Sequence, residues 1–275
     1  AIVGEHQGTA IIINRFFGTI LNASFGIANQ VNSIIRSFAQ CLGQAVVPQI
    51  TKSYSSGDKK RASNLIILSS KYSFFLMALP MLPILLETDF VLNIWLKEVP
   101  KYTNIFVQAM LIRSIIFIID YAIGPYIDAS GKIKYFKMTS SGLTLLCIPC
   151  AYFGFKSGYP PYIITYIYFC SAIITLIIDI VLMKIILNYN IFEFFKKSIF
   201  RIILVCLSIT PLFFIINLFP SGFLRFVIFS IVSEIVLVVS IYYLGMDYIE
   251  RKSIKNYINK AKGKLRKVNV PATIN

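Results

Sequence analysis

The sequence predicts an all-α, polytopic bundle of membrane helices, and three observations support this prediction. Hydrophobic residues make up 57% of the 275 residues, and the mean hydropathy is +0.73. Apolar runs of roughly 20 residues recur, which is the length an α-helix needs to cross a hydrocarbon core about 30 Å thick. Charged residues are only 14% of the chain and collect between these runs. The alternation of apolar and polar residues that marks a membrane β-barrel does not occur.

The apolar runs predict about eight membrane helices, separated by glycine and proline residues that interrupt helices. Pro80 and Pro83 fall inside the third run and predict a kink there. Short helices at the membrane surface are expected at 190–197 and 91–96. The predicted membrane spans are 2–18, 24–50, 62–87, 102–127, 136–156, 161–187, 199–218 and 223–245.

The distribution of charge between the runs predicts the orientation of the chain. Basic residues dominate the junctions at 51–61, 131–137 and 184–201 and the tail from residue 247. The junctions at 87–101 and 219–222 carry no positive excess. Because positive loops stay in the cytoplasm, the basic junctions and the C-terminus are expected to be cytoplasmic. We interpret the basic tail as a contact with anionic membrane lipids rather than with nucleic acid.

The second predicted helix carries a stripe of polar residues through the membrane. Its members recur at helical spacing and therefore share one face: Asn29, Ser33, Arg36, Gln40 and Gln44. A stripe with an arginine at its centre is costly to expose to lipid, so we expect it to line a water-filled cavity. The alternative is hydrogen bonding between helices that only holds the bundle together.

Further charged residues fall inside the predicted helices. Arg113 and Asp120 are two turns apart on one face and are expected to share a cavity, or Asp120 pairs with a basic residue on another helix. Asp179 and Glu234 lie on late apolar helices, where structural pairing is the expectation. Lys71 is expected to extend toward the cytoplasmic side, where its helix begins.

Cations outnumber anions across the first four predicted helices, which include Arg15, Arg36 and Arg113. This excess predicts an anionic ligand. Catalysis has little support, because the single histidine, His6, lies near the start of the chain and no ATP-binding glycine loop occurs. Cys147-x-x-Cys150 lies in an apolar run without a second pair to complete a metal site. We expect no enzyme activity, no cofactor and no metal.

Short motifs in this chain resemble one family of membrane transporters. The most specific block comprises Asn14-Arg15-Phe16-Phe17-Gly18, Asn22-Ala23, Gly26-Ile27-Ala28-Asn29-Gln30-Val31 and Pro48-Gln49-Ile50, followed by Lys52-Ser53-Tyr54 and Gly57-Asp58. Weaker matches are Ala129-Ser130-Gly131-Lys132-Ile133-Lys134 and Gly158-Tyr159-Pro160-Pro161-Tyr162. Together they resemble the bacterial polysaccharide biosynthesis and O-antigen flippases of the multidrug/oligosaccharidyl-lipid/polysaccharide exporter superfamily.

The resemblance implies a plan of two six-helix lobes and two extra helices around a central cavity. On this plan, residues 1–188 are the second lobe, 189–246 an interfacial segment with the extra pair, and 247–275 a basic cytoplasmic tail. The first residue is Ala1 and no signal peptide pattern follows, so we expect a fragment that lacks the first lobe.

The implied cargo is an undecaprenyl-diphosphate-linked oligosaccharide, moved outward across the bacterial inner membrane for surface polysaccharide synthesis. Membrane lipids, a polysaccharide polymerase and glycosyltransferases are the other expected partners. A diphosphate is bound well by arginine and amide donors. The candidate cavity residues are therefore Arg15, Asn22, Asn29, Ser33, Arg36, Gln40, Gln44 and Arg113. The candidates for coupling to H⁺ or Na⁺ are Asp120 and Asp179.

Two alternatives remain open. An ion-coupled multidrug exporter of the same superfamily takes cationic compounds and should have acidic cavity residues. A non-transporting membrane scaffold of a glycan-assembly complex should satisfy its polar stripe entirely within the bundle.

Overall fold

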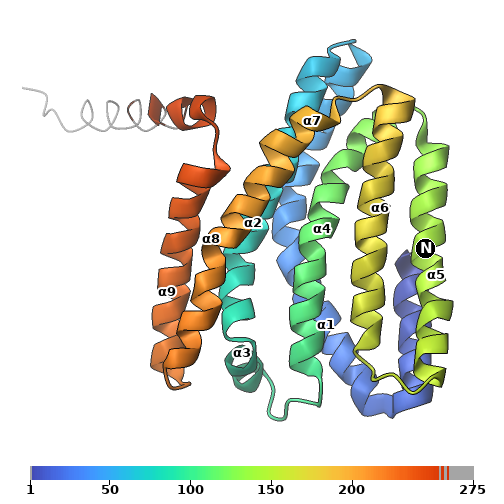
Figure 1. The fold of residues 1–275 in the computed structure, drawn as a ribbon, viewed down its shortest axis with the longest axis vertical. Helices are drawn as coiled ribbons and strands as arrows, with labels where there is room; N and C mark the ends of the chain where they lie inside the picture. Colours follow the sequence, from blue (N-terminus) through green and yellow to red (C-terminus); the bar gives the residue numbers. More distant parts are fainter. Residues whose placement is uncertain (1, 254, 257–258, 260–275) are drawn as a thin grey trace, which may run out of the picture.

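The computed structural model describes residues 2–253, 255–256 and 259, and this part of the chain is helical without any strand (Figure 1). Seven helices in it are long and apolar enough to cross a membrane. The predicted all-α polytopic membrane bundle is therefore confirmed. The elements are α1 Ile2–Ser55, α2 Lys59–Leu86, α3 Thr88–Trp95, α4 Thr103–Ala129, α5 Ile133–Lys156, α6 Ile163–Leu187, α7 Ile191–Phe194, η1 Phe195–Ile199, α8 Phe200–Ile215, η2 Ile216–Leu218, α9 Phe223–Ser240 and η3 Ile241–Gly245.

Helix α1 bends sharply at Gly18 and supplies the first two predicted membrane passes. Gly18 has φ 83° and ψ −179°, a backbone conformation that is essentially restricted to glycine. Figure 1 shows the first limb of α1 descending beside α5 and the second limb turning back toward the opposite end of the bundle. The sequence predicted a break between the spans 2–18 and 24–50; the break occurs at Gly18, but the helix resumes directly after this one residue, without a loop.

Helices α1, α2 and α4 form the centre of the bundle, and two helix pairs flank it. Helices α5 and α6 lie on one side and helices α8 and α9 on the other (Figure 1), where the last pair packs against α2. The centre is closed by fully buried aromatic side chains; Phe25 of α1 meets Phe106 of α4 edge to face, with ring centroids 5.8 Å apart. Such contacts add to the area that each ring buries.

The outer faces of α6, α8 and α9 are apolar. Their most exposed side chains include Ile174, Ile177, Leu207, Phe214, Ile228, Ile231 and Ile235. An apolar surface of this extent is stable in contact with lipid and costly in contact with water. These three helices therefore present the lipid-facing side of the bundle.

The last two membrane passes both contain a π-helical turn, η1 in one and η3 in the other. Residues 191–218 form one continuous span, so the short helix expected at 190–197 is the first part of this span and not a separate element. The other expected short helix, at 91–96, corresponds to α3. In η3, a Cβ on Gly245 would lie 2.5 Å from the Phe75 ring, so glycine allows α9 to approach α2 closely.

The junction between α6 and α7 is fixed by a buried tyrosine. Ser63 at the start of α2 donates a 3.0 Å hydrogen bond to the Tyr189 hydroxyl. Burial raises the pKa of Tyr189 to about 12, so the phenol stays protonated at neutral pH. This contact joins the basic junction at 184–201 to the first turns of α2.

Candidate functional site

The polar stripe lies on the second limb of α1 and is only partly buried. Ser33 and Gln44 are exposed, whereas Asn29, Arg36 and Gln40 are half-buried. The Asn29 amide donates a 3.1 Å hydrogen bond to the Phe25 carbonyl of its own helix. In the described part of the chain, none of the five side chains of the stripe therefore forms a hydrogen bond with another helix.

The exposed face of this limb differs from the lipid-facing surfaces of the bundle. Apart from Ile20, Ile34 and Phe38, the exposed positions between residues 19 and 45 are small or polar, and they include Gly26, Gln30, Ser33, Ser37, Cys41 and Gln44. The corresponding faces of α6, α8 and α9 are rich in large aliphatic and aromatic residues. A polar helix face in a membrane protein belongs against water or against protein.

Arg36 sits in this face with its charge unpaired. Its guanidinium stacks on the Phe117 ring of α4, with the guanidinium carbon 3.3 Å from the ring centroid. Among the described residues it has no ion pair, and its Nε is buried without a hydrogen-bond partner. The charges nearest to it are Arg113 and Glu5. An arginine held on an aromatic ring and lacking a counter-charge is a suitable group for binding an anion.

Arg113 is held in a different way. Its Nη2 lies 2.8 Å from the Oε1 of Glu5 on the first limb of α1, and Glu5 is only 3% exposed. Its guanidinium carbon also lies 4.6 Å from the ring centroid of Tyr168 on α6. The Tyr168 hydroxyl is hydrogen-bonded to Thr9, one turn after Glu5. Glu5 offsets one of the two arginine charges, so this group of three charges retains a net charge of about +1.

Glu5 and Tyr168 belong to this group although the sequence did not single them out. The spacing of Glu5 and Thr9, four residues apart, puts both on one helix face and was the available signal. The other candidates, Arg15 and Asn22, flank the bend at Gly18 and have no hydrogen bonds to described residues. They lie near one end of the bundle, away from Arg36.

Asp120 of α4 and Asp179 of α6 face each other. Their carboxyl groups lie close enough to interact electrostatically, and Asp179 is 6% exposed. One oxygen of each is buried without a further hydrogen-bond partner among the described residues. Lys137 of α5 is the nearest cation. Two carboxyl groups held close together cannot both be ionised at low cost.

The structural partner expected for Asp179 is therefore another acid and not a cation. Glu234, for which a similar pairing was expected, has no ion pair among the described residues. Lys71 extends toward the end of the bundle where α2 begins, which was the expected direction, but it does not reach water. It is fully buried and its Nζ lies 2.6 Å from Glu250, in the segment after the last membrane helix.

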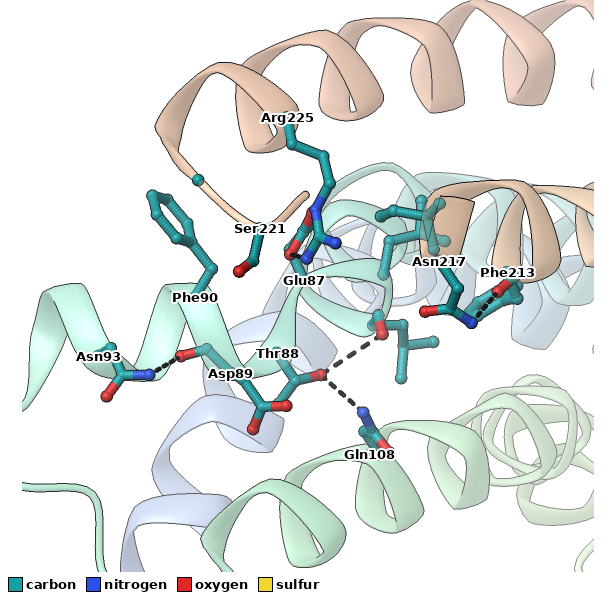
Figure 2. Close-up of a pocket in the computed structure, with 14 residues that line it drawn as sticks. Glu87, Thr88, Asp89, Phe90, Asn93, Gln108, Phe213, Asn217, Ser221 and Arg225 are labelled. Carbon is teal, nitrogen blue, oxygen red and sulfur yellow. Dashed lines mark hydrogen bonds and ion pairs between the residues drawn. The ribbon is translucent and has the colours of Figure 1, made fainter. Parts of the chain in front are cut away.

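A polar cavity of about 700 Å³ lies where α2 meets α3, at the end of the bundle opposite to Glu250. Figure 2 shows Arg225 of α9 reaching Glu87 at the end of α2, with Nε–Oε1 and Nη2–Oε2 distances of 2.5 and 2.7 Å. Sequence reasoning missed this pair, because its members are 138 residues apart. The remaining polar lining residues are Thr88, Asp89, Asn93, Gln108, Asn217 and Ser221.

Within the described residues, no group of three or more histidine, cysteine, aspartate or glutamate residues is arranged to hold a metal ion. Comparisons with known proteins found no matching protein-family model, no matching curated protein and no matching solved structure.

Proposed function

We propose that this chain is one lobe of a bacterial flippase. The proposed cargo is an undecaprenyl-diphosphate-linked oligosaccharide, which moves from the cytoplasmic to the outer leaflet of the inner membrane for surface polysaccharide synthesis. The motifs at 14–58 and 129–162 that resemble polysaccharide flippases support this proposal. The observation that carries it is the unpaired guanidinium of Arg36 in a polar helix face.

A diphosphate fits this helix face chemically. It carries negative charge and several acceptor oxygens, which match a guanidinium and neighbouring amide groups. Arg36 supplies the charge, and Gln40 and Asn29 lie within two turns of it on the same side of α1. The exposed polar face would then line the cavity between this lobe and a second one, while α6, α8 and α9 face lipid.

Each alternative is less compatible with the contacts. A multidrug exporter for cationic compounds needs acidic groups in its cavity, but residues 19–49, which form the polar face of α1, contain no acid, and Glu5 is bound to Arg113. A scaffold needs a stripe that is satisfied within the bundle, but Ser33 and Gln44 are exposed. The contacts therefore favour a transporter of an anionic cargo.

We further propose that transport is coupled to proton movement through Asp120 and Asp179. These side chains connect α4, which carries Arg113 and Phe117, to α6, which carries Tyr168. Protonation or deprotonation of either carboxyl group would change the force between the two helices, because two ionised carboxylates repel each other. The arginine group and the carboxyl pair are thus joined through the same two helices.

The test of cargo binding is Arg36→Ala in the full-length protein in glycan-producing cells. Removing a charge-assisted hydrogen bond costs about 1.5–3 kcal/mol, so we expect surface glycan to fall by about 10- to 100-fold. The lipid-linked unit should accumulate on the cytoplasmic side, measured by extraction and mass spectrometry. Arg36→Lys keeps the charge but loses the planar fork and should give an intermediate level.

One control and one double variant accompany this experiment. Lys134→Ala removes an exposed cation at the start of α5 and should leave glycan export unchanged. Arg113→Ala alone leaves Glu5 without a counter-charge, so Arg113 is tested together with Glu5→Gln. Normal surface glycan in Arg36→Ala, with the protein present at its usual level, would disprove the diphosphate-binding role.

A further inference from the structure

The polar cavity at the α2–α3 junction has the construction of a ligand site. Helix α2 contains Pro80 and Pro83 and ends at Leu86, and α3 begins at once with Thr88. This abrupt change leaves space between α3, α4 and the turn that joins η2 to α9. The resulting volume of about 700 Å³ is in the range of small-molecule sites.

The hydrogen bonds inside the cavity determine what its amides can offer a ligand. Asn93 donates to the Asp89 carbonyl at 2.7 Å, Gln108 to the Thr88 hydroxyl at 3.2 Å, and Asn217 to the Phe213 carbonyl at 3.1 Å. Figure 2 shows each of these contacts. Because each amide uses one N–H for the protein, its carbonyl oxygen and its second N–H remain available to a ligand.

The charges of the cavity do not favour an anion. Arg225 is the single cation among its described lining residues, and it is bound by Glu87 and by the Phe219 carbonyl at 2.9 Å. The carboxylate of Asp89 is exposed and has no ion pair among the described residues. The ligand that fits best therefore both donates and accepts hydrogen bonds and carries no negative charge of its own at this site.

Two aromatic rings complete the lining. Phe90 lies on α3, where its ring packs against Phe226 with centroids 5.1 Å apart, and Phe213 lies near the end of α8. Apolar ring faces pack well against the C–H faces of a pyranose, while its hydroxyls reach the surrounding acceptors. Acceptor-rich side chains next to apolar rings fit a neutral sugar better than a phosphate or a lipid chain.

We propose that this cavity binds the carbohydrate part of the transported molecule. The assignment rests on the proposed function, since it is the lipid-linked cargo that brings the sugar to this protein. It goes beyond that function by separating two sites: the diphosphate is bound at Arg36 in the polar helix face, and the glycan at the α2–α3 end of the bundle.

The proposal is tested by photocross-linking in glycan-producing cells that express the full-length protein. The photoreactive residue p-benzoylphenylalanine replaces Asn93 in one variant and Asn217 in another, and a matched control carries it at Ile231 on the lipid-facing side of α9. After irradiation the protein is purified, and the sugar attached to it is measured by acid hydrolysis and mass spectrometry. This readout detects any sugar, whatever the composition of the glycan.

We expect attached sugar at Asn93 and Asn217, none at Ile231, and its loss in cells that cannot make the lipid-linked unit. With the photoreactive residue at Ser221, the additional pair Asn93→Leu and Asn217→Leu should abolish the attached sugar. Absence of sugar at both cavity positions, or equal amounts at Ile231, would overturn the proposal.

The two proposed sites can fail independently. If sugar is attached in the cavity but Arg36→Ala exports glycan normally, the diphosphate role fails and the carbohydrate site stands. If no sugar is attached but Arg36→Ala blocks export, only the carbohydrate site is excluded.

Discussion

At the scale of single residues, Arg36 and Arg113 show how similar side chains acquire different roles. Arg113 is bound by a buried glutamate, so its charge is offset inside the bundle. Arg36 rests on an aromatic ring and has no ion pair among the described residues. The sequence predicted that cations outnumber anions in the first helices but not the Glu5–Arg113 contact, which joins positions 108 residues apart.

The carboxyl pair supports a prediction at this scale. Asp120→Asn and Asp179→Asn each keep a hydrogen-bonding group of the same size and remove one titrating site. We expect both variants to fold and to lose the response of glycan export to an imposed pH gradient, measured as the export rate at different external pH values. Glu98→Gln, an exposed acid in a loop, is the control and should respond normally.

A pH response that is unchanged in both aspartate variants would exclude this pair as the coupling site. The sequence identified the two aspartates as candidates but did not predict that their carboxyl groups lie close together. That contact depends on the rotation of α4 and α6 about their axes. Neither helix has an amphipathic pattern strong enough to fix this rotation from sequence, since apolar residues surround both aspartates.

At the scale of elements, the bend at Gly18 is the feature that local sequence reasoning described least well. Helix ends were predicted within a few residues elsewhere, because glycine and proline act on the backbone locally. The sequence predicted a break at Gly18, but not that the reversal takes a single residue. The run 190–199 was misread for a related reason: its basic and aromatic residues suit a membrane surface and also the first turns of a spanning helix.

Gly18→Ala is expected to destabilise the folded protein by about 1–3 kcal/mol, because a side chain cannot adopt this backbone conformation without strain. Gly26→Ala is the matched control on the same helix. Gly26 has an ordinary helical backbone and no atom within 4 Å of the added carbon, so alanine should be neutral or stabilising. Thermal unfolding in lipid nanodiscs measures both, and equal stability of the two variants would contradict the assigned role of the bend.

At the scale of the whole molecule, composition was sufficient to predict the class of fold. Recurring apolar runs, separated by charged junctions, leave few structures other than a membrane helix bundle. The pairs that join distant helices, such as Glu87–Arg225, were beyond prediction because nothing local distinguishes these residues. The candidate site was predicted only in part. The polar stripe follows from residue spacing along one helix, whereas the residues that contact it from other helices cannot be found from spacing.

The orientation predicted from the basic junctions is testable with cysteine labelling. In a background without the five native cysteines, a cysteine at Ser221 should react with a membrane-impermeant maleimide added outside intact cells. A cysteine at Lys134 should react only after the cells are permeabilised. Labelling of Lys134→Cys but not Ser221→Cys in intact cells would reverse the topology and place the α2–α3 cavity in the cytoplasm.

The contact between Lys71 and Glu250 has a practical consequence for any shortened version of this protein. Glu250 follows the last membrane helix, in the stretch that composition describes only as a charged tail. Truncation after Gly245 would remove the counter-charge of an ammonium group that has no access to water, and a buried charge left alone costs several kcal/mol. It would also remove Asp247, which binds Arg201 at 2.8 Å. The smallest unit that can fold stably therefore extends past the membrane to at least Glu250.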